Sequence, residues 1–411
     1  MKRLLGVILV LGVAACSDSN DSSGPDNESQ LVVGALLSLT GPGQTLGRTS
    51  EAALELAADD LNARFSDQDS PVRVSLRIED TGLDPTKALD QLRTLTGQGV
   101  RIFVGPQSSS EVAALKPFAD SAGIVLLSQG STAGSLSIPD DNVFRLVPDD
   151  AAEGAALVEL LQEDGIQTVV PLWREDAGNQ GLHDAVERLF EAAGGTVTTG
   201  ASYAVGTTDF TATLATIKSQ IQDAVAQGGA GTVAVYFAAF EESTVAIFDA
   251  VSADPAFSQV RWYGGDGVVQ SALLLADPEA AAFAAATEFR APTYGLDDQL
   301  LQEHADLIDA IEARSGLPAD AFTLAAYDAL HVAALAYADV GLESISAYRS
   351  ALLDQAAGYT GATGPTELNA AGDRAVGDYD FYQVCPGGPA SWVRVSAYRA
   401  STGSVASIGG C

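Results

Sequence analysis

Short apolar runs alternate with amphipathic segments along most of the chain. Leu31 to Leu37 is an apolar run of strand length, and residues 48–65 place Leu54, Ala58 and Leu61 at helical spacings of four and three. The alternation of strand and helix then continues through 72–78, 85–97, 101–104, 111–122 and 124–127. Parallel strands need long crossovers, so this pattern predicts a parallel sheet with helices on both faces.

A second succession of the same kind begins near residue 149. It predicts helices at 151–161, 181–193 and 211–226 and strands at 168–173, 232–237 and 260–263. Beyond Pro292 follow helical segments at 298–314 and 320–339, and strand-like runs at 379–384 and 392–398. The fold class that we expect is α/β, with two lobes that are each built on a doubly wound parallel sheet.

The N-terminus has the pattern of an export signal. Lys2 and Arg3 precede an apolar run that is too short to span a bilayer, and a small-residue site follows and ends at Cys16. The site is similar to a bacterial lipobox, so we expect a signal peptide at 1–15 and a lipid on Cys16; a plain secretory signal is the alternative. Residues 16–30 then read as a flexible tether.

Cysteine usage agrees with export. If the lipid occupies Cys16, the remaining cysteines are Cys385 and Cys411, an even pair in an oxidising compartment. We expect a disulfide between them that holds the C-terminal tail, and two free thiols are the alternative.

The charge limits the class of partner. The chain has 54 Asp and Glu against 21 Lys and Arg, for a formal net charge of −33, and its only lysines are Lys2, Lys87, Lys116 and Lys218. Such a surface repels nucleic acid and anionic lipid headgroups. It is typical of proteins that work in concentrated salt, although an ordinary acidic exported protein fits equally well.

Enzyme chemistry finds little support in the sequence. His183, His304 and His331 lie far apart and fall in helical stretches without metal-ligand spacing. No nucleophile elbow, Walker loop or dinucleotide fingerprint follows a strand. We therefore expect no catalytic residue, no metal and no cofactor.

Several turns resemble those of the leucine-isoleucine-valine-binding proteins, in the same order along the chain. They are Thr40-Gly41-Pro42 with Gly47, Asp80 with Asp84-Pro85, Val104-Gly105-Pro106 through Ser109, Gly123 through Thr132, and Gly364-Pro365-Thr366 with Gly372-Asp373-Arg374. Each motif alone is weak, but together they cover nearly all of the mature chain.

The resemblance implies a type I periplasmic binding fold, in which a three-segment hinge joins two lobes around a ligand. We expect crossings near Val147, Ala291 and Asp373. Lobe 1 would then comprise 31–147 and 292–372, and lobe 2 would comprise 148–291 and 373–411.

The same resemblance suggests how a zwitterionic ligand is held. Ser109, Thr132 and the backbone of Gly130 would bind its carboxylate, and Asp266 its ammonium. A helix N-cap role for Ser109, a turn role for Thr132 and an Asx-turn role for Asp266 are the alternatives.

Apolar residues would line the rest of the cleft. Phe240 stands where relatives often carry Tyr, so the cleft is less polar than theirs and could admit a larger apolar side chain. Leu46, Trp173 and Phe322 are the other lining candidates, although each fits a simple core position as well.

The implied function is binding without catalysis. We expect an exported lipoprotein, held to a membrane only by its lipid, that delivers a branched-chain or other apolar amino acid to the permease of an ABC importer as a monomer. A ligand-sensing module for a membrane receptor is one alternative. A binder of amides, urea or short organic acids is another.

The charge leads to a test of salt dependence. Removal of residues 1–15 deletes Lys2 and Arg3, so the mature chain carries −35 and its self-repulsion should weaken the fold in dilute buffer. The melting temperature of the mature protein should therefore rise between low salt and about 1 M, where screening is nearly complete. A flat response would remove the salt-adapted interpretation.

Overall fold

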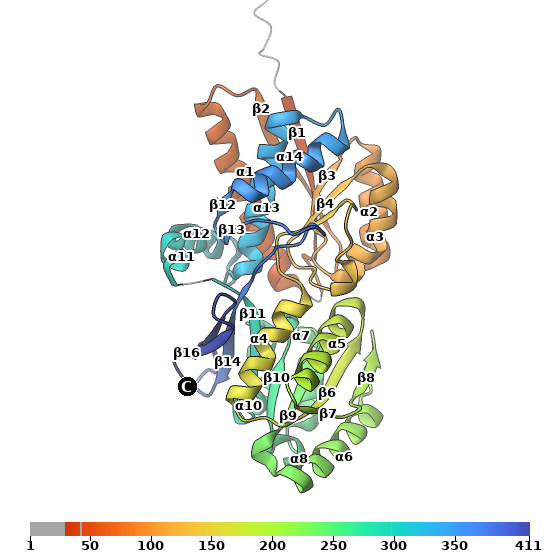
Figure 1. The fold of residues 1–411 in the computed structure, drawn as a ribbon, viewed down its shortest axis with the longest axis vertical. Coiled ribbons are helices and arrows are strands. Elements are labelled where there is room, and N and C mark those ends of the chain that lie inside the picture. Colours follow the sequence, from red (N-terminus) through yellow and green to blue (C-terminus); the bar gives the residue numbers. More distant parts are fainter. Residues whose placement is uncertain (1–28, 42, 297) are drawn as a thin grey trace, which may run out of the picture.

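The computed structural model describes residues 29–41, 43–296 and 298–411, which form two α/β lobes stacked along the long axis of the molecule (Figure 1). Each lobe has its own sheet with helices packed around it. The signal peptide predicted at 1–15, Cys16 and nearly all of the tether predicted at 16–30 lie outside the described residues.

The first sheet has the strand order β2-β1-β3-β4-β5 and is parallel throughout. Val33 and Ala35 of β1 pack on one face against α1 and α13, whereas Leu36 packs on the other face against α2 and α3. The doubly wound prediction is therefore confirmed for this lobe. Its strands are β1 (Ser29–Leu37), β2 (Val72–Asp80), β3 (Ile102–Val104), β4 (Val125–Ser128) and β5 (Val143–Arg145). Its helices are α1 (Gln44–Asp67), α2 (Pro85–Gly97), α3 (Ser109–Ala122), α11 (Asp298–Glu303), α12 (Ala305–Ser315), α13 (Ala321–Val340) and α14 (Ile345–Gly358).

Helix α13 forms the centre of the first lobe. It is long and apolar enough to cross a membrane by length and composition, but 78% of its apolar window is buried inside the protein. Its burial against α1 and β11 identifies it as a core helix.

The second sheet has the order β16-β15-β14-β11-β10-β9-β6-β7, and β8 also pairs with β6. Its strands are β6 (Thr168–Glu175), β7 (Thr196–Val197), β8 (Ala201–Ala204), β9 (Val233–Ala238), β10 (Arg261–Gly264), β11 (Arg290–Gly295), β14 (Asp378–Cys385), β15 (Ser391–Arg399) and β16 (Ser404–Ser407). Its helices are α4 (Asp150–Glu163), α5 (Ala177–Ala192), α6 (Thr211–Gly228), α7 (Glu241–Val251), α8 (Pro255–Ser258), α9 (Ala272–Ala276) and α10 (Pro278–Ala286). A small hairpin, β12 (Thr360–Gly361) with β13 (Gly364–Pro365), completes the described strands.

The second sheet is not parallel throughout. Strands β6 to β11 are parallel, but β14, β15 and β16 extend the sheet in antiparallel fashion. The connection between Cys385 and Ser391 is too short for a crossover, so these strands can only form a hairpin.

Two element predictions need correction. The single helix expected at 298–314 is divided at His304 into α11 and α12. Strand β11 was not predicted, because Pro292 suggested the end of a lobe rather than the interior of a strand.

The strand ends place two of the three crossings later than predicted. Residues 292–295 still belong to β11 of the second sheet, so the chain returns to the first lobe only after Gly295. Asp373 still forms a bridge with Arg145 of the first sheet, so the last crossing follows Arg374. The first crossing lies between the end of β5 and the start of α4, and the limit predicted near Val147 falls within this segment.

A buried ion pair joins the first and third crossings. Arg145 Nε and Nη2 donate to the two carboxylate oxygens of Asp373, at 2.5 and 2.8 Å, and both side chains are almost fully buried. The same guanidinium donates from Nη1 to the carbonyls of Ala133, at 2.8 Å, and Ser131, at 3.3 Å. One side chain thus holds the hinge and the loop after β4 together.

A disulfide closes the C-terminal end of the chain. Cys385, the last residue of β14, pairs with Cys411, as the cysteine count predicts, and their Cα atoms are 5.2 Å apart. The bridge attaches the tail to the antiparallel part of the second sheet.

We expect this bridge to stabilise the protein measurably. A closed loop with a sequence separation of 26 contributes about 3.5 kcal/mol in the chain-entropy account, so a double Cys385→Ser, Cys411→Ser variant should unfold at lower urea. Reductant should destabilise the parent protein but leave the variant unchanged. Two reactive thiols in the unreduced, denatured parent would contradict the bridge.

Candidate functional site

The candidate site is a cleft between the lobes, where each sheet reverses its strand order. In the first sheet β1 lies between β2 and β3, and in the second sheet β6 lies between β7 and β9. The carboxyl ends of strands at such switch points form a crevice that suits a ligand. The segments that follow β1, β3, β6 and β9 contribute Gly43, Gln107, Gly178 and Phe240 to its lining.

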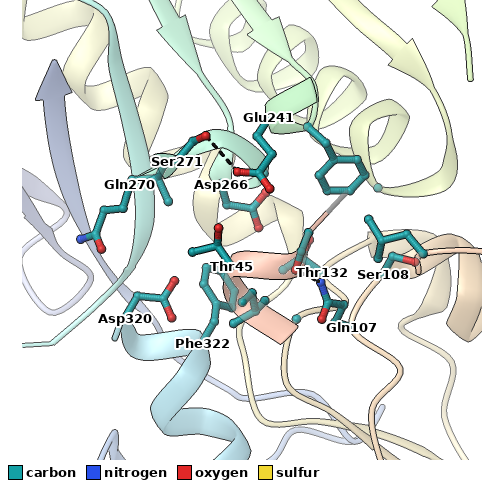
Figure 2. Close-up of a pocket in the computed structure, with 18 of the residues that line it drawn as sticks. Thr45, Gln107, Ser108, Thr132, Glu241, Asp266, Gln270, Ser271, Asp320 and Phe322 are labelled. Atoms are coloured by element: carbon teal, nitrogen blue, oxygen red, sulfur yellow. Dashed lines mark hydrogen bonds between the residues drawn. The ribbon is translucent and has the colours of Figure 1, made fainter. Parts of the chain in front are cut away.

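The cleft has a volume of about 920 Å³, which includes space open to solvent. Seven of the residues expected at the ligand lie along it: Leu46, Ser109, Gly130, Thr132, Phe240, Asp266 and Phe322. They come from both lobes and from segments far apart in the sequence (Figure 2).

Trp173 is not among the residues that line the cleft. Its ring stacks on His183 of α5, with the ring centroids 3.8 Å apart, and its Nε1–H donates to Gln180 at 2.9 Å. The side chain belongs to the packing between β6 and α5, so its expected place at the ligand was wrong.

Ser109 presents its hydroxyl to the cleft from the start of α3. The N-cap of that helix is Ser108, which forms a capping box with Glu111, so Ser109 does not serve as the cap. Ser109 Oγ accepts from the Ala133 N–H at 3.2 Å and from the Ser131 hydroxyl at 3.1 Å. Its own proton is therefore available for an acceptor in the cleft.

Gly130 lets two loops of the first lobe approach each other. A Cβ at this position would lie 2.9 Å from the carbonyl oxygen of Gln107 and 3.3 Å from Leu46. Thr132, in the same loop, is nearly buried, and its carbonyl accepts from the Asp150 N–H at 2.9 Å. The loop that lines the cleft is thus bonded directly to the first helix of the second lobe.

The two lobes also touch beside the cleft. The N–H of Ala177, at the start of α5, donates to Ser110 Oγ of α3 at 3.2 Å. A Cβ on Gly178 would stand 3.7 Å from Ser109 Oγ, so a side chain there would narrow the entrance. The lobes are therefore in contact on this side in the described conformation.

Asp266 faces the cleft from the second lobe, directly after β10 (Figure 2). Burial raises the pKa of its carboxyl to about 7, repulsion from Asp320 adds to this shift, and the Gly267 N–H opposes it. Its own N–H donates to Glu153 Oε1 at 3.1 Å. Glu153 thus holds the backbone of Asp266, and the Gly267 N–H contacts its carboxylate.

Two further carboxylates of the cleft were missed in the sequence. Glu241 is 4% exposed and accepts from the Ser271 hydroxyl at 2.9 Å, and burial raises its pKa. Asp320 caps α13 by accepting from the Thr323 N–H at 2.8 Å, and burial raises its pKa as well. The sequence shows a helix-capping pattern before α13, but the residues around Asp320 do not indicate that this cap faces a ligand cleft.

A buried acidic layer lies behind Asp266. Asp150 and Glu153 of α4 are 2% and 1% exposed, and Asp266 raises the pKa of both by repulsion, in addition to burial. The pKa of Asp150 reaches about 8, although the Thr132 hydroxyl beside it opposes the shift. Protons are therefore held in this layer near neutral pH.

Two residues of the cleft have a strained backbone. Leu83 and Gln270 both have φ of 56°, in the left-handed region that side chains other than Gly, Asn and Asp seldom adopt. Such outliers persist only where the surrounding structure enforces them, and they concentrate at functional sites.

Comparison with known proteins agrees with this geometry. A sequence model of the periplasmic binding protein family matches residues 30–389. The chain belongs to this family. Members bind solutes outside the cytoplasm, so this periplasmic binding protein is extracytoplasmic and is not an enzyme.

Individual relatives cover from three quarters to nearly all of the chain. An uncharacterised protein of Methanocaldococcus jannaschii is 27% identical over 421 residues, which cover 98% of this chain and 97% of the relative. The Leu/Ile/Val-binding protein BraC3 of Rhizobium johnstonii is 24% identical over 314 residues, with 75% and 79% coverage. A solute-binding protein of an R. palustris ABC transporter, solved with benzoate, has 19% identity and a TM-score of 0.70, with 89% and 96% coverage.

The buried acids predict that the ligand-free protein loses stability as pH rises from 6.5 to 8.5. The folded state still binds protons at Asp266 and Asp150, while the unfolded chain, with Asp near 3.8, does not. Each such proton lowers the unfolding free energy by at most about 1.4 kcal/mol per pH unit.

Urea unfolding at several pH values measures how the free energy of unfolding changes with pH. Asp150→Asn should flatten this dependence, because the amide resembles the protonated acid, whereas Asp223→Asn, on the exposed surface of α6, should not. Stability that rises with pH over this range would contradict the protonated layer.

Proposed function

We propose that this periplasmic binding protein holds an amino acid between its lobes and delivers it to an ABC importer. The observation that carries the proposal is the placement of Asp266 on the second lobe across the cleft from Thr132 on the first (Figure 2). Ser109 of the first lobe lines the same cleft. An α-amino acid carries a carboxylate and an ammonium close together, and burying both is costly unless each meets an oriented partner.

The first lobe suits the carboxylate. Ser109 has a proton to donate, Gly130 allows backbone to approach closely, and Thr132 adds a hydroxyl at the same edge. The second lobe suits the ammonium, because Asp266 is an acid without a basic side-chain partner among the described contacts. A closed cleft would bring the two half-sites onto one ligand.

Apolar contacts are available for the carbon chain of the ligand. Leu46, Phe240 and Phe322 line the cleft, and Phe240 brings no hydroxyl. Branched-chain amino acids are the first candidates, since the Rhizobium relative carries the name Leu/Ile/Val-binding protein.

The family supports an extracytoplasmic location and an ABC transporter as the partner, and we add a lipid anchor to these. We propose that Cys16 is lipidated after removal of residues 1–15, so that residues 16–30 tether a monomer to the membrane. The permease of the importer would then receive the ligand from the closed lobes. Reporting to a membrane receptor would use the same cleft, and genes beside this one would tell the two roles apart.

A second ligand class is supported by one observation. The R. palustris neighbour with the same fold was solved with benzoate, so organic acids are accommodated within the fold. Here such an anion would meet only neutral donors and three carboxylates, which favours the amino acid.

Replacement of Asp266 tests the proposal. A panel of amino acids, amides and carboxylates is screened by thermal shift, in which a ligand at 100 times its Kd should add about 2.7 kcal/mol of stability. Asp266→Asn removes the charge but keeps the size, so affinity for the best amino acid should fall about 30-fold or more, because an ammonium is left unpaired.

The control is Asp223→Asn, which removes an exposed charge far from the cleft and should leave the affinity unchanged. Calorimetry on both variants gives the comparison. Equal affinity of Asp266→Asn and the parent would show that the ammonium is bound elsewhere.

A further inference from the structure

The charge of the cleft exceeds what one ammonium requires. Glu241, Asp266 and Asp320 line it, and no Lys, Arg or His is found among its described lining residues. Arg174 stands behind Phe240, at 4.2 Å from the ring, but Asp176 and Glu242 already pair with it. Acidic side chains from both lobes therefore line the cleft, and no basic side chain among the described lining residues balances them.

The role of Asp320 as a helix cap does not explain its negative charge. Both of its hydrogen bonds to Thr323, from the N–H at 2.8 Å and the hydroxyl at 2.9 Å, end on Oδ1. Asn or Ser would cap α13 equally well without a charge. A full carboxylate at this place is costly to bury beside Asp266, and a cation in the cleft would offset that cost.

The polar groups are arranged in sequence along the cleft. Figure 2 shows Thr132 and Ser108 on one side, Asp266 and Glu241 in the middle, and Asp320 with Gln270 on the other side. An elongated ligand with its carboxylate at Thr132 and its α-ammonium at Asp266 would therefore extend its side chain toward Asp320.

A single metal ion does not explain the three acids. Among the described residues, the only group whose ligand atoms lie within 4.8 Å of one another is His183, Asp184 and Glu187 on α5, outside the cleft. The carboxylates of the cleft are thus too dispersed for one ion, whereas two separated cationic groups on an organic ligand match them.

Closure of the lobes also requires a cationic group in the cleft. Asp320 belongs to the first lobe and Asp266 and Glu241 to the second, so closing the cleft brings like charges together. A cation between them turns this repulsion into attraction across the lobes.

We propose that the amino acid has a basic side chain, whose terminal cation is bound by Asp320, and whose methylene groups lie against Leu46 and Phe322. The proposal rests on the proposed amino-acid binding and narrows it to the lysine, ornithine and arginine class. It replaces the branched-chain expectation with a ligand that uses the same apolar contacts.

Lysine and norleucine are the matched probes, because norleucine has the same carbon chain without the terminal ammonium. Calorimetry on the mature protein near pH 8 should give lysine an affinity about 30-fold or more above that of norleucine. In Asp320→Asn the ratio of the two affinities should fall toward one. The ligand-free melting temperature should not fall below that of the parent, since Asn also caps the helix and removes the repulsion between Asp320 and Asp266.

Asp354→Asn, an exposed change on α14, is the charge control and should keep the ratio of the parent. Tighter binding of norleucine or leucine than of lysine would overturn the basic side chain while leaving amino-acid binding intact. A ratio unaffected by Asp320→Asn would overturn the role of Asp320. Failure of every amino acid to bind would instead refute the proposed function itself.

Discussion

The buried pair of Arg145 and Asp373 is the contact on which the arrangement of the lobes depends. It joins the last residue of β5 to the segment that leads into β14, so two of the three crossings are held by one bidentate interaction. Breaking a buried pair typically costs about 3–5 kcal/mol, because the remaining charge stays uncompensated. The guanidinium also fixes the carbonyls of Ser131 and Ala133, on either side of Thr132. The orientation of the binding loop and the geometry of the hinge are therefore set together.

The fold was readable from the sequence because its helices and strands are strongly periodic. Helix α2 was predicted at its observed bounds, and strand β1 within two residues of its start. Strand β11 was missed because Pro292 lacks an N–H. The structure tolerates this proline because β11 pairs with β10 only through Arg290, so no ladder bond to β10 is lost at residue 292. The antiparallel end of the second sheet followed from the short connection after Cys385, which the expectation of uniform parallel strands overlooked.

The candidate site was predictable only in part, for a physical reason. Residues within a few positions of a strand end, such as Ser109 and Asp266, are placed by local chain order, so a pattern can locate them. Trp173 was misplaced because the sequence does not show which face of β6 is covered by α5, where its ring stacks on His183. Asp320 reaches the cleft only because α13 packs across the first lobe, and such a contact between distant segments leaves no local signature. The sequence shows its role as a helix cap, but not which residues of the cleft lie beside it.

The division of the cleft between two switch points has an evolutionary consequence. In the proposed function the first lobe supplies neutral donors for the common part of a ligand, and the groups that would distinguish one ligand from another lie at the ends of separate loops and helices. Substitutions at Phe240 or Gln270 can alter what is accepted without disturbing either sheet, because the strands end before these positions. A lineage with this architecture can therefore change the solute that it binds through a few loop substitutions, while the residues of the sheets and the hinge stay the same.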